Sequence, residues 1–197
     1  MRKTVGWVAV AAAVLMAGAA APAGATERGP ARVTGWAEFE LPFGADADVR
    51  SFEFDARSAP WSRPIPAEGG EHGSPADATG TVRVAHYLAS EKVTVRWEAA
   101  VDCLMTSPGH ATVTAIVTRA DDYAKSLLGT RVGFSVQDGG RGRDRVGFTW
   151  DATFDQNEAG EWGPSRIGPC LSTAAFGTVT RGDFRIRHAE LTPPPSR

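Results

Sequence analysis

The sequence predicts an all-β domain, an antiparallel β-sandwich or barrel of about nine strands. Apolar and polar residues alternate in one segment after another, which is the two-residue period of strands with one buried face. The segments follow one another at the spacing of β-hairpins, and only one short stretch has helical spacing. Periodicity does not specify how distant strands pair, so the sandwich and the closed barrel are both compatible with the sequence.

The clearest strand pair lies in residues 131–150, where the tetrapeptide Arg-Val-Gly-Phe occurs twice. Side chains alternate between the two faces of a strand, so residues that pair on one buried face have position numbers with an even sum. Pairing Phe134 with Phe148 satisfies this rule and leaves residues 139–143 as the loop. The other pairs in this register are Val136–Val146, Val132–Trp150 and, at the open end of the hairpin, Asp138–Asp144.

The remaining strands are predicted from the same alternation. In chain order they span residues 33–41, 49–57, 79–89, 92–104, 111–119, 175–180 and 184–191. The inward-facing side chains are expected to be Val33, Ala37, Phe39, Leu41, Phe52, Phe54, Val82, Val84, His86, Leu88, Val93, Val95, Trp97, Ala99, Val101, Val113, Ala115 and Val117. His86 is then a core residue with a single hydrogen bond. The last two segments are interpreted as a closing pair joined by a turn at Arg181-Gly182-Asp183.

One short helix is predicted over residues 119–128. Ala120, Tyr123 and Leu127 have helical spacing there, two aspartates lie near the expected N-terminus, and Gly129 follows as the terminating residue. One or two turns are expected to cap the sheet.

Composition predicts the domain organisation. A basic start, an apolar run and small residues up to Ala25 indicate that residues 1–25 are a signal peptide. Residues 26–191 are expected to form a single all-β domain. Within it, residues 58–78 are rich in Pro, Gly and Ala and are predicted to be a long flexible loop. The proline-rich tail, residues 192–197, is expected to be disordered.

The signal peptide predicts a secreted, extracellular protein, and no later run reaches the roughly 18 apolar residues that a membrane helix needs. The chain has 21 basic and 23 acidic residues; loss of Arg2 and Lys3 with the signal peptide leaves a net charge of −4. A small negative net charge is unlike the strong positive charge of nucleic-acid-binding proteins, so no nucleic-acid partner is expected. The protein is expected to be a monomer. Cys103 and Cys170, the only cysteines, are predicted to form a disulfide under oxidising conditions.

Charged residues crowd the tip of the central hairpin. Asp138 and Asp144 face each other in the predicted register, which is unfavourable unless positive charge lies between them. The simplest interpretation is a tight, glycine-rich loop in which Asp–Arg pairs neutralise the charge. One alternative is a Ca²⁺ site built on Asp138 and Asp144, and another is an acidic ligand bound by Arg141 and Arg143.

Three tryptophans, Trp36, Trp61 and Trp162, have no place in the predicted core. They are candidates for a surface on which sugars stack, and the alternative is that they pack under the long loops. Gly133 and Gly147 lie together on the outer face of the hairpin. They either leave a bare patch for one of these rings or simply allow strongly coiled strands.

These features predict a non-catalytic domain that binds cell-envelope or extracellular polymer, with no cofactor unless the hairpin tip holds Ca²⁺. A rival is a secreted hydrolase acting on polysaccharide, with Glu38, Glu40 and His110 as candidate groups, although glutamates on an outer strand face are more often solvated. A third candidate function is a barrel that encloses a small apolar ligand. It predicts an internal cavity on the order of several hundred Å³.

The chain resembles a group of uncharacterised exported proteins from high-GC Gram-positive bacteria, some of which carry the label repetin. The resemblance rests on Gly35-Trp36-Ala37-Glu38-Phe39, on Val101-Asp102-Cys103-Leu104 and on the hairpin segment 132–144. It covers most of the chain after the signal peptide. It implies a secreted all-β domain and provides no catalytic residues.

Overall fold

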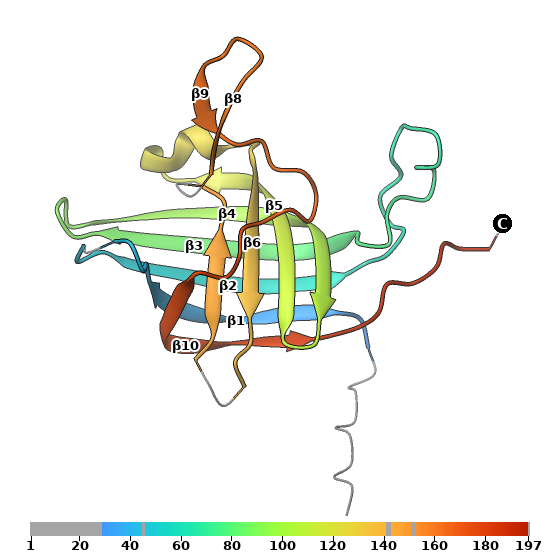
Figure 1. Cartoon of the computed structure of the whole chain (residues 1–197), viewed down its shortest axis with the longest axis horizontal. Coiled ribbons are helices and arrows are strands. Elements are labelled where there is room, and N and C mark those ends of the chain that lie inside the picture. The colour runs from blue at the N-terminus through green and yellow to red at the C-terminus, as the bar shows by residue number, and fades with distance from the viewer. Residues whose placement is uncertain (1–28, 45, 141–142, 151–152, 197) are drawn as a thin grey trace, which may run out of the picture.

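In the computed structural model, eight antiparallel strands close into a barrel (Figure 1). Their order around the barrel is β1-β10-β7-β6-β5-β4-β3-β2. Neighbours in the barrel are neighbours in the chain, apart from the inserted hairpin β8–β9 and the closure of the last strand, β10, on the first, β1. The strands are β1 (Arg32–Glu40), β2 (Val49–Ser58), β3 (Ala78–Leu88), β4 (Val93–Ser107), β5 (His110–Ala120), β6 (Arg131–Gln137), β7 (Arg145–Phe148), β8 (Phe154–Gln156), β9 (Trp162–Pro164) and β10 (Gly177–Arg187). The all-β prediction is confirmed, and the barrel is the alternative that forms.

The structure describes residues 29–44, 46–140, 143–150 and 153–196. The predicted signal peptide and Arg141 lie outside these residues. The short helix between β5 and β6 is a 3₁₀ helix, η1 (Asp122–Leu127), which buries Ala124 and leaves Tyr123 64% exposed. In the described ranges no helix has the length and apolar character needed to cross a membrane.

The barrel is filled at one end by phenylalanine rings. Phe54 makes edge-to-face contacts with Phe134 and Phe184, in each case with 5.4 Å between ring centroids. All three side chains are fully buried, and the predicted alternation put Phe54 and Phe134 inward. Edge-to-face aromatic pairs of this kind stabilise a core beyond the area that they bury. This end of the barrel is therefore a solid core.

The central hairpin has the predicted register over its paired length. Phe134 pairs with Phe148 and Val136 with Val146. β7 ends at Phe148, so the predicted pair of Val132 with Trp150 does not form, and the Thr149 backbone N–H instead donates to the Gly133 carbonyl.

The predicted closing pair of strands is wrong, because residues 177–187 form one continuous strand, β10. Arg181-Gly182-Asp183 lies inside this strand and pairs with β1. A β-bulge explains the error: Glu38 pairs with Arg181 but Phe39 pairs with Val179, so one extra residue, Thr180, enters the ladder. That residue shifts the inward-facing positions from odd to even numbers, a change that resembles a turn between two strands.

The predicted disulfide is present, between Cys103 in β4 and Cys170. It anchors a strap, residues 168–176, that crosses the outer face of β6 and β7. A Cβ at Gly133 would lie 2.2 Å from the Leu171 carbonyl oxygen, and one at Gly147 would lie 2.1 Å from that of Ala174. The two glycines therefore make room for backbone, where the sequence suggested an aromatic ring or coiling alone.

The segment predicted to be a long flexible loop, residues 58–78, connects β2 to β3, and its first and last residues belong to these strands. It is organised by a buried carboxylate, Asp77, that was not predicted from the sequence. Asp77 Oδ2 accepts hydrogen bonds from the backbone N–H groups of Ser62, Arg63 and Ser74, at 2.9–3.1 Å. The Arg63 guanidinium donates to the Ala78 and Val101 carbonyls, each at 2.7 Å. These bonds attach the loop to the filled end of the barrel.

Candidate functional site

A cavity of about 990 Å³ opens at the end of the barrel opposite the filled core. We call this end the mouth; β1, β3, β5 and β7 end there, and β2, β4 and β6 begin there. The helix η1 and residues 164–167 also line the cavity. Its size is at the upper end of the range for pockets that hold one small ligand.

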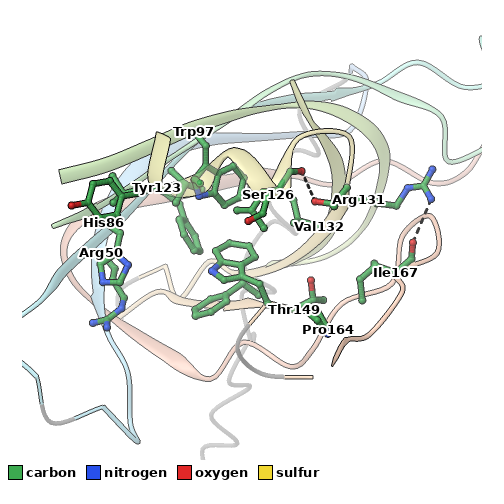
Figure 2. Close-up of a pocket in the computed structure, with 18 of the residues that line it drawn as sticks. Arg50, His86, Trp97, Tyr123, Ser126, Arg131, Val132, Thr149, Pro164 and Ile167 are labelled. Carbon is green, nitrogen blue, oxygen red and sulfur yellow. Dashed lines mark hydrogen bonds between the residues drawn. The ribbon is translucent and has the colours of Figure 1, made fainter. Parts of the chain in front are cut away.

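The inner wall of the cavity is aromatic. Trp150 lies at the centre of this wall, with its ring centroid 4.4 Å from that of Phe148, 5.1 Å from that of Trp97 and 5.6 Å from that of Phe52. Phe39 and Val95 extend the apolar surface. Figure 2 shows rings between two polar ends, with Arg50 and His86 at one end and Arg131 and Ile167 at the other.

The first polar end is a cluster of paired charges. His86 Nε2 lies 2.7 Å from Asp48 Oδ2, and Arg50 donates two hydrogen bonds to Asp46, at 2.7 and 2.9 Å. The Arg50 bonds hold the pKa of Asp46 at about 2. The backbone N–H of Ala89 donates to Asp48 and, together with His86, lowers the pKa of that carboxyl. An ionised Asp48 fixes the proton of a neutral His86 on Nε2, which leaves Nδ1 as a hydrogen-bond acceptor.

The second polar end fixes residues 164–167, the segment that forms the lip of the cavity. Asp102 lies at an irregularity in the pairing of β4 with β5, and its carboxylate accepts hydrogen bonds from Arg131 at 2.7 Å and from Thr114 at 2.6 Å. Arg131 also donates to the Ile167 carbonyl at 3.3 Å. Since Cys170 follows three residues later, the disulfide and Arg131 together fix the segment that forms this lip.

Tyr123 lies on η1, which lines part of the cavity, and contacts the loop between β3 and β4. Its hydroxyl is hydrogen-bonded to Glu91, and this bond raises the pKa of Tyr123. The contact joins elements on two sides of the mouth.

No protein-family model matches the chain, and no curated protein or solved structure matches it significantly. The function must therefore be argued from the site itself.

The three candidate tryptophans lie in separate parts of the molecule. Trp36 is on the outer wall in β1, 39% exposed, with the Arg181 guanidinium 5.6 Å from its ring centroid. Trp61 lies in the loop at the filled end, where its Nε1 donates to the Thr192 carbonyl. Trp162 is 71% exposed on β9, and Figure 1 shows that hairpin far from the loop that carries Trp61. The fold does not assemble them into one platform.

The two aspartates of the hairpin tip bind backbone N–H groups. Asp144, only 5% exposed, accepts from Gly139 and Phe184, and Asp138 accepts from Gly140 and Ile186. Each oxygen already has a donor, which favours the structural interpretation of the tip. In the described ranges, no three His, Cys, Asp or Glu side chains gather as a metal site. Arg143 is exposed.

The candidate hydrolase groups lie on opposite sides of the barrel. Glu38 and Glu40 belong to β1, where Glu38 is 3.5 Å from Arg181, and Glu40 is exposed. His110 is exposed at the start of β5, and three strands separate β5 from β1 in either direction around the barrel. These groups share no cleft.

The cavity as a whole was not predicted from the sequence, although several of its residues were placed. Trp97, Val95 and Phe52 were predicted to face inward, and all three line the cavity. His86 was predicted to be a core residue with one hydrogen bond; it makes that bond, but its side chain is 32% exposed at the mouth. The available signal was the crowding of aromatic residues near one end of the strands. Alternation alone does not show whether inward rings meet or leave a space.

Proposed function

We propose that this chain is a secreted, non-catalytic barrel that binds one small, largely apolar molecule in its mouth. The observation that carries the proposal is the cavity of about 990 Å³ with aromatic walls, in a barrel whose other end is filled. Eight strands enclose a space that either side chains fill or one small ligand occupies. In this barrel, side chains fill one end, and the mouth at the other end leaves space for one ligand.

Binding is favoured over catalysis because the charged groups at the two polar ends of the mouth are paired with one another. Among the described residues, His86 makes its one hydrogen bond to Asp48, so no nucleophile is held against it. Arg131 is paired with Asp102. The disulfide supports export, since such bonds persist in oxidising compartments.

A neutral probe whose fluorescence rises in apolar surroundings, N-phenyl-1-naphthylamine, tests the proposal. The purified protein is expected to bind it saturably with one site. Val95→Trp places a large ring in the cavity and is expected to weaken probe binding at least tenfold. Thr94→Trp is the matched control, because the neighbouring side chain points to the opposite face of β4. Failure of the native protein to bind the probe would contradict the proposal.

A groove on the outer wall favours a second candidate function, the binding of extracellular polymer. The groove has a volume of about 410 Å³ and includes Trp36. Arg83 lies in it between Glu53 and Glu98, at 3.2 and 3.1 Å. An exposed ring beside paired polar groups is the kind of surface on which sugars stack. Co-sedimentation with cell-wall material tests this function, and Trp36→Ala is expected to abolish it while Trp162→Ala leaves it unchanged.

A further inference from the structure

We propose that the ligand of the mouth is an uncharged, apolar molecule that carries a hydrogen-bond acceptor, such as a carbonyl oxygen, and that the indole N–H of Trp97 binds this acceptor. The inference rests on the proposed binding function and specifies the chemical class of the ligand. It starts from a polar atom of the cavity wall that has no partner.

Trp97 is only 7% exposed, and no residue that the structure describes accepts a hydrogen bond from its Nε1. This nitrogen is not one of the enclosed side-chain atoms without a partner, Ser135 Oγ and Ser172 Oγ, so it is open to the cavity and not enclosed in the wall. The indole of Trp150, 5.1 Å away between ring centroids, has no such bond either. A tryptophan N–H usually finds a partner when its ring is buried, so an indole N–H that is open to the cavity can donate to a bound ligand. Figure 2 shows the nitrogen of Trp97 on the side of its ring that faces the cavity.

The surroundings favour an acceptor without charge. Two of the three arginines that line the cavity are neutralised within the protein, since Arg50 is 2.7 Å from Asp46 and Arg131 is 2.7 Å from Asp102, and the third, Arg166, is exposed to solvent. A carboxylate placed against the buried Trp97 would lose its water, and that loss is unfavourable unless a cation pairs with it. A carbonyl or ether oxygen has a smaller desolvation cost than a carboxylate, and it gains a hydrogen bond from the indole N–H.

Two matched ligands test the inference: 2-acetylnaphthalene carries a carbonyl oxygen, and 2-isopropylnaphthalene has the same shape without it. Native protein is expected to bind the ketone five- to tenfold more tightly, which is the effect of about one net hydrogen bond. Trp97→Phe keeps a ring in the wall and removes the N–H. It is expected to abolish most of this preference while changing the affinity for the hydrocarbon less than twofold. Trp36→Phe, on the outer wall, is the control and should leave both affinities unchanged.

The outcomes separate the two proposals. If native protein binds neither compound, the binding function itself fails. If it binds both equally, or if Trp97→Phe keeps the preference for the ketone, the binding function stands and the assignment of Trp97 is overturned. Tighter binding of 2-naphthoate than of the ketone would overturn the assignment of an uncharged ligand.

Discussion

The carboxylate of Asp144 accepts a hydrogen bond from the backbone N–H of Phe184 at 2.7 Å, at a point where β10 continues beyond its partner strand. β7 pairs with β10 only through Val146 and Arg145. Asp144 and then Asp138 supply the acceptors that a longer β7 would have provided. Side chains thus complete the ladder at the seam where the barrel closes.

Asp144→Ala is expected to destabilise the protein by about 2–4 kcal/mol, because it leaves the buried N–H of Phe184 and that of Gly139 without an acceptor. Urea unfolding followed by tryptophan fluorescence measures the change. Asp183→Ala is the control, since the exposed pair of Asp183 with Arg185 contributes little. Equal stability of the two variants would contradict the structural role of Asp144.

Gly147→Ala is expected to lower the free energy of unfolding by about 1–3 kcal/mol. The new methyl group would lie 2.1 Å from the Ala174 carbonyl oxygen, so the strap must move away from the barrel. Gly163→Ala is the matched control, because no atom lies within 4 Å of its added Cβ. Thermal unfolding of both variants distinguishes close packing from a general effect of replacing glycine.

Replacing both cysteines, Cys103→Ala with Cys170→Ala, is expected to destabilise the protein by about 4 kcal/mol. The bridge spans 67 residues, and the loop-entropy relation gives this figure for a closed loop of that length. The strap should also lose its fixed position, so hydrogen exchange is expected to rise in residues 168–176. Unchanged exchange there would show that the strap is held without the disulfide.

Acid is expected to lower the free energy of unfolding, in part by protonating the carboxylates of the polar cluster at the mouth. Arg50 holds the pKa of Asp46 at about 2, below the ordinary value of 3.8, and the pKa of Asp48 is also lowered. A carboxyl with a lowered pKa in the folded state stabilises it above pH 4 and loses that contribution as the pH falls toward 2. Asp46→Asn is therefore expected to flatten the fall in stability between pH 4 and pH 2. The exposed Asp183→Asn should leave the curve unchanged.

Much of the fold could be predicted because each half-buried strand carries its own period. The register of Phe134 with Phe148 followed from parity alone, and so did the inward positions of β1 to β5. The error at Thr180 shows the limit of the method. A bulge adds one residue, and its local signature resembles the end of a strand.

The candidate site was less accessible to prediction, because it depends on which residues are brought together. Asp48 and His86 are 38 positions apart and meet only because β2 and β3 pair in this register. The cavity is a property of volume: inward rings fill one end of the barrel and line a space at the other. No local pattern in the chain distinguishes these two outcomes.

The pairing of β1 with β10 joins the two extremes of the domain, with Val33 opposite Ile186. Barrel closure must therefore wait until the last strand has been synthesised, and contacts of such long sequence separation slow the folding of a domain. Until then, β1 and β7 present unpaired edges to any other chain nearby. During translation the unpaired edges of β1 and β7 can therefore pair with strands of other chains. Aggregation is expected mainly for nascent protein and for chains truncated before β10.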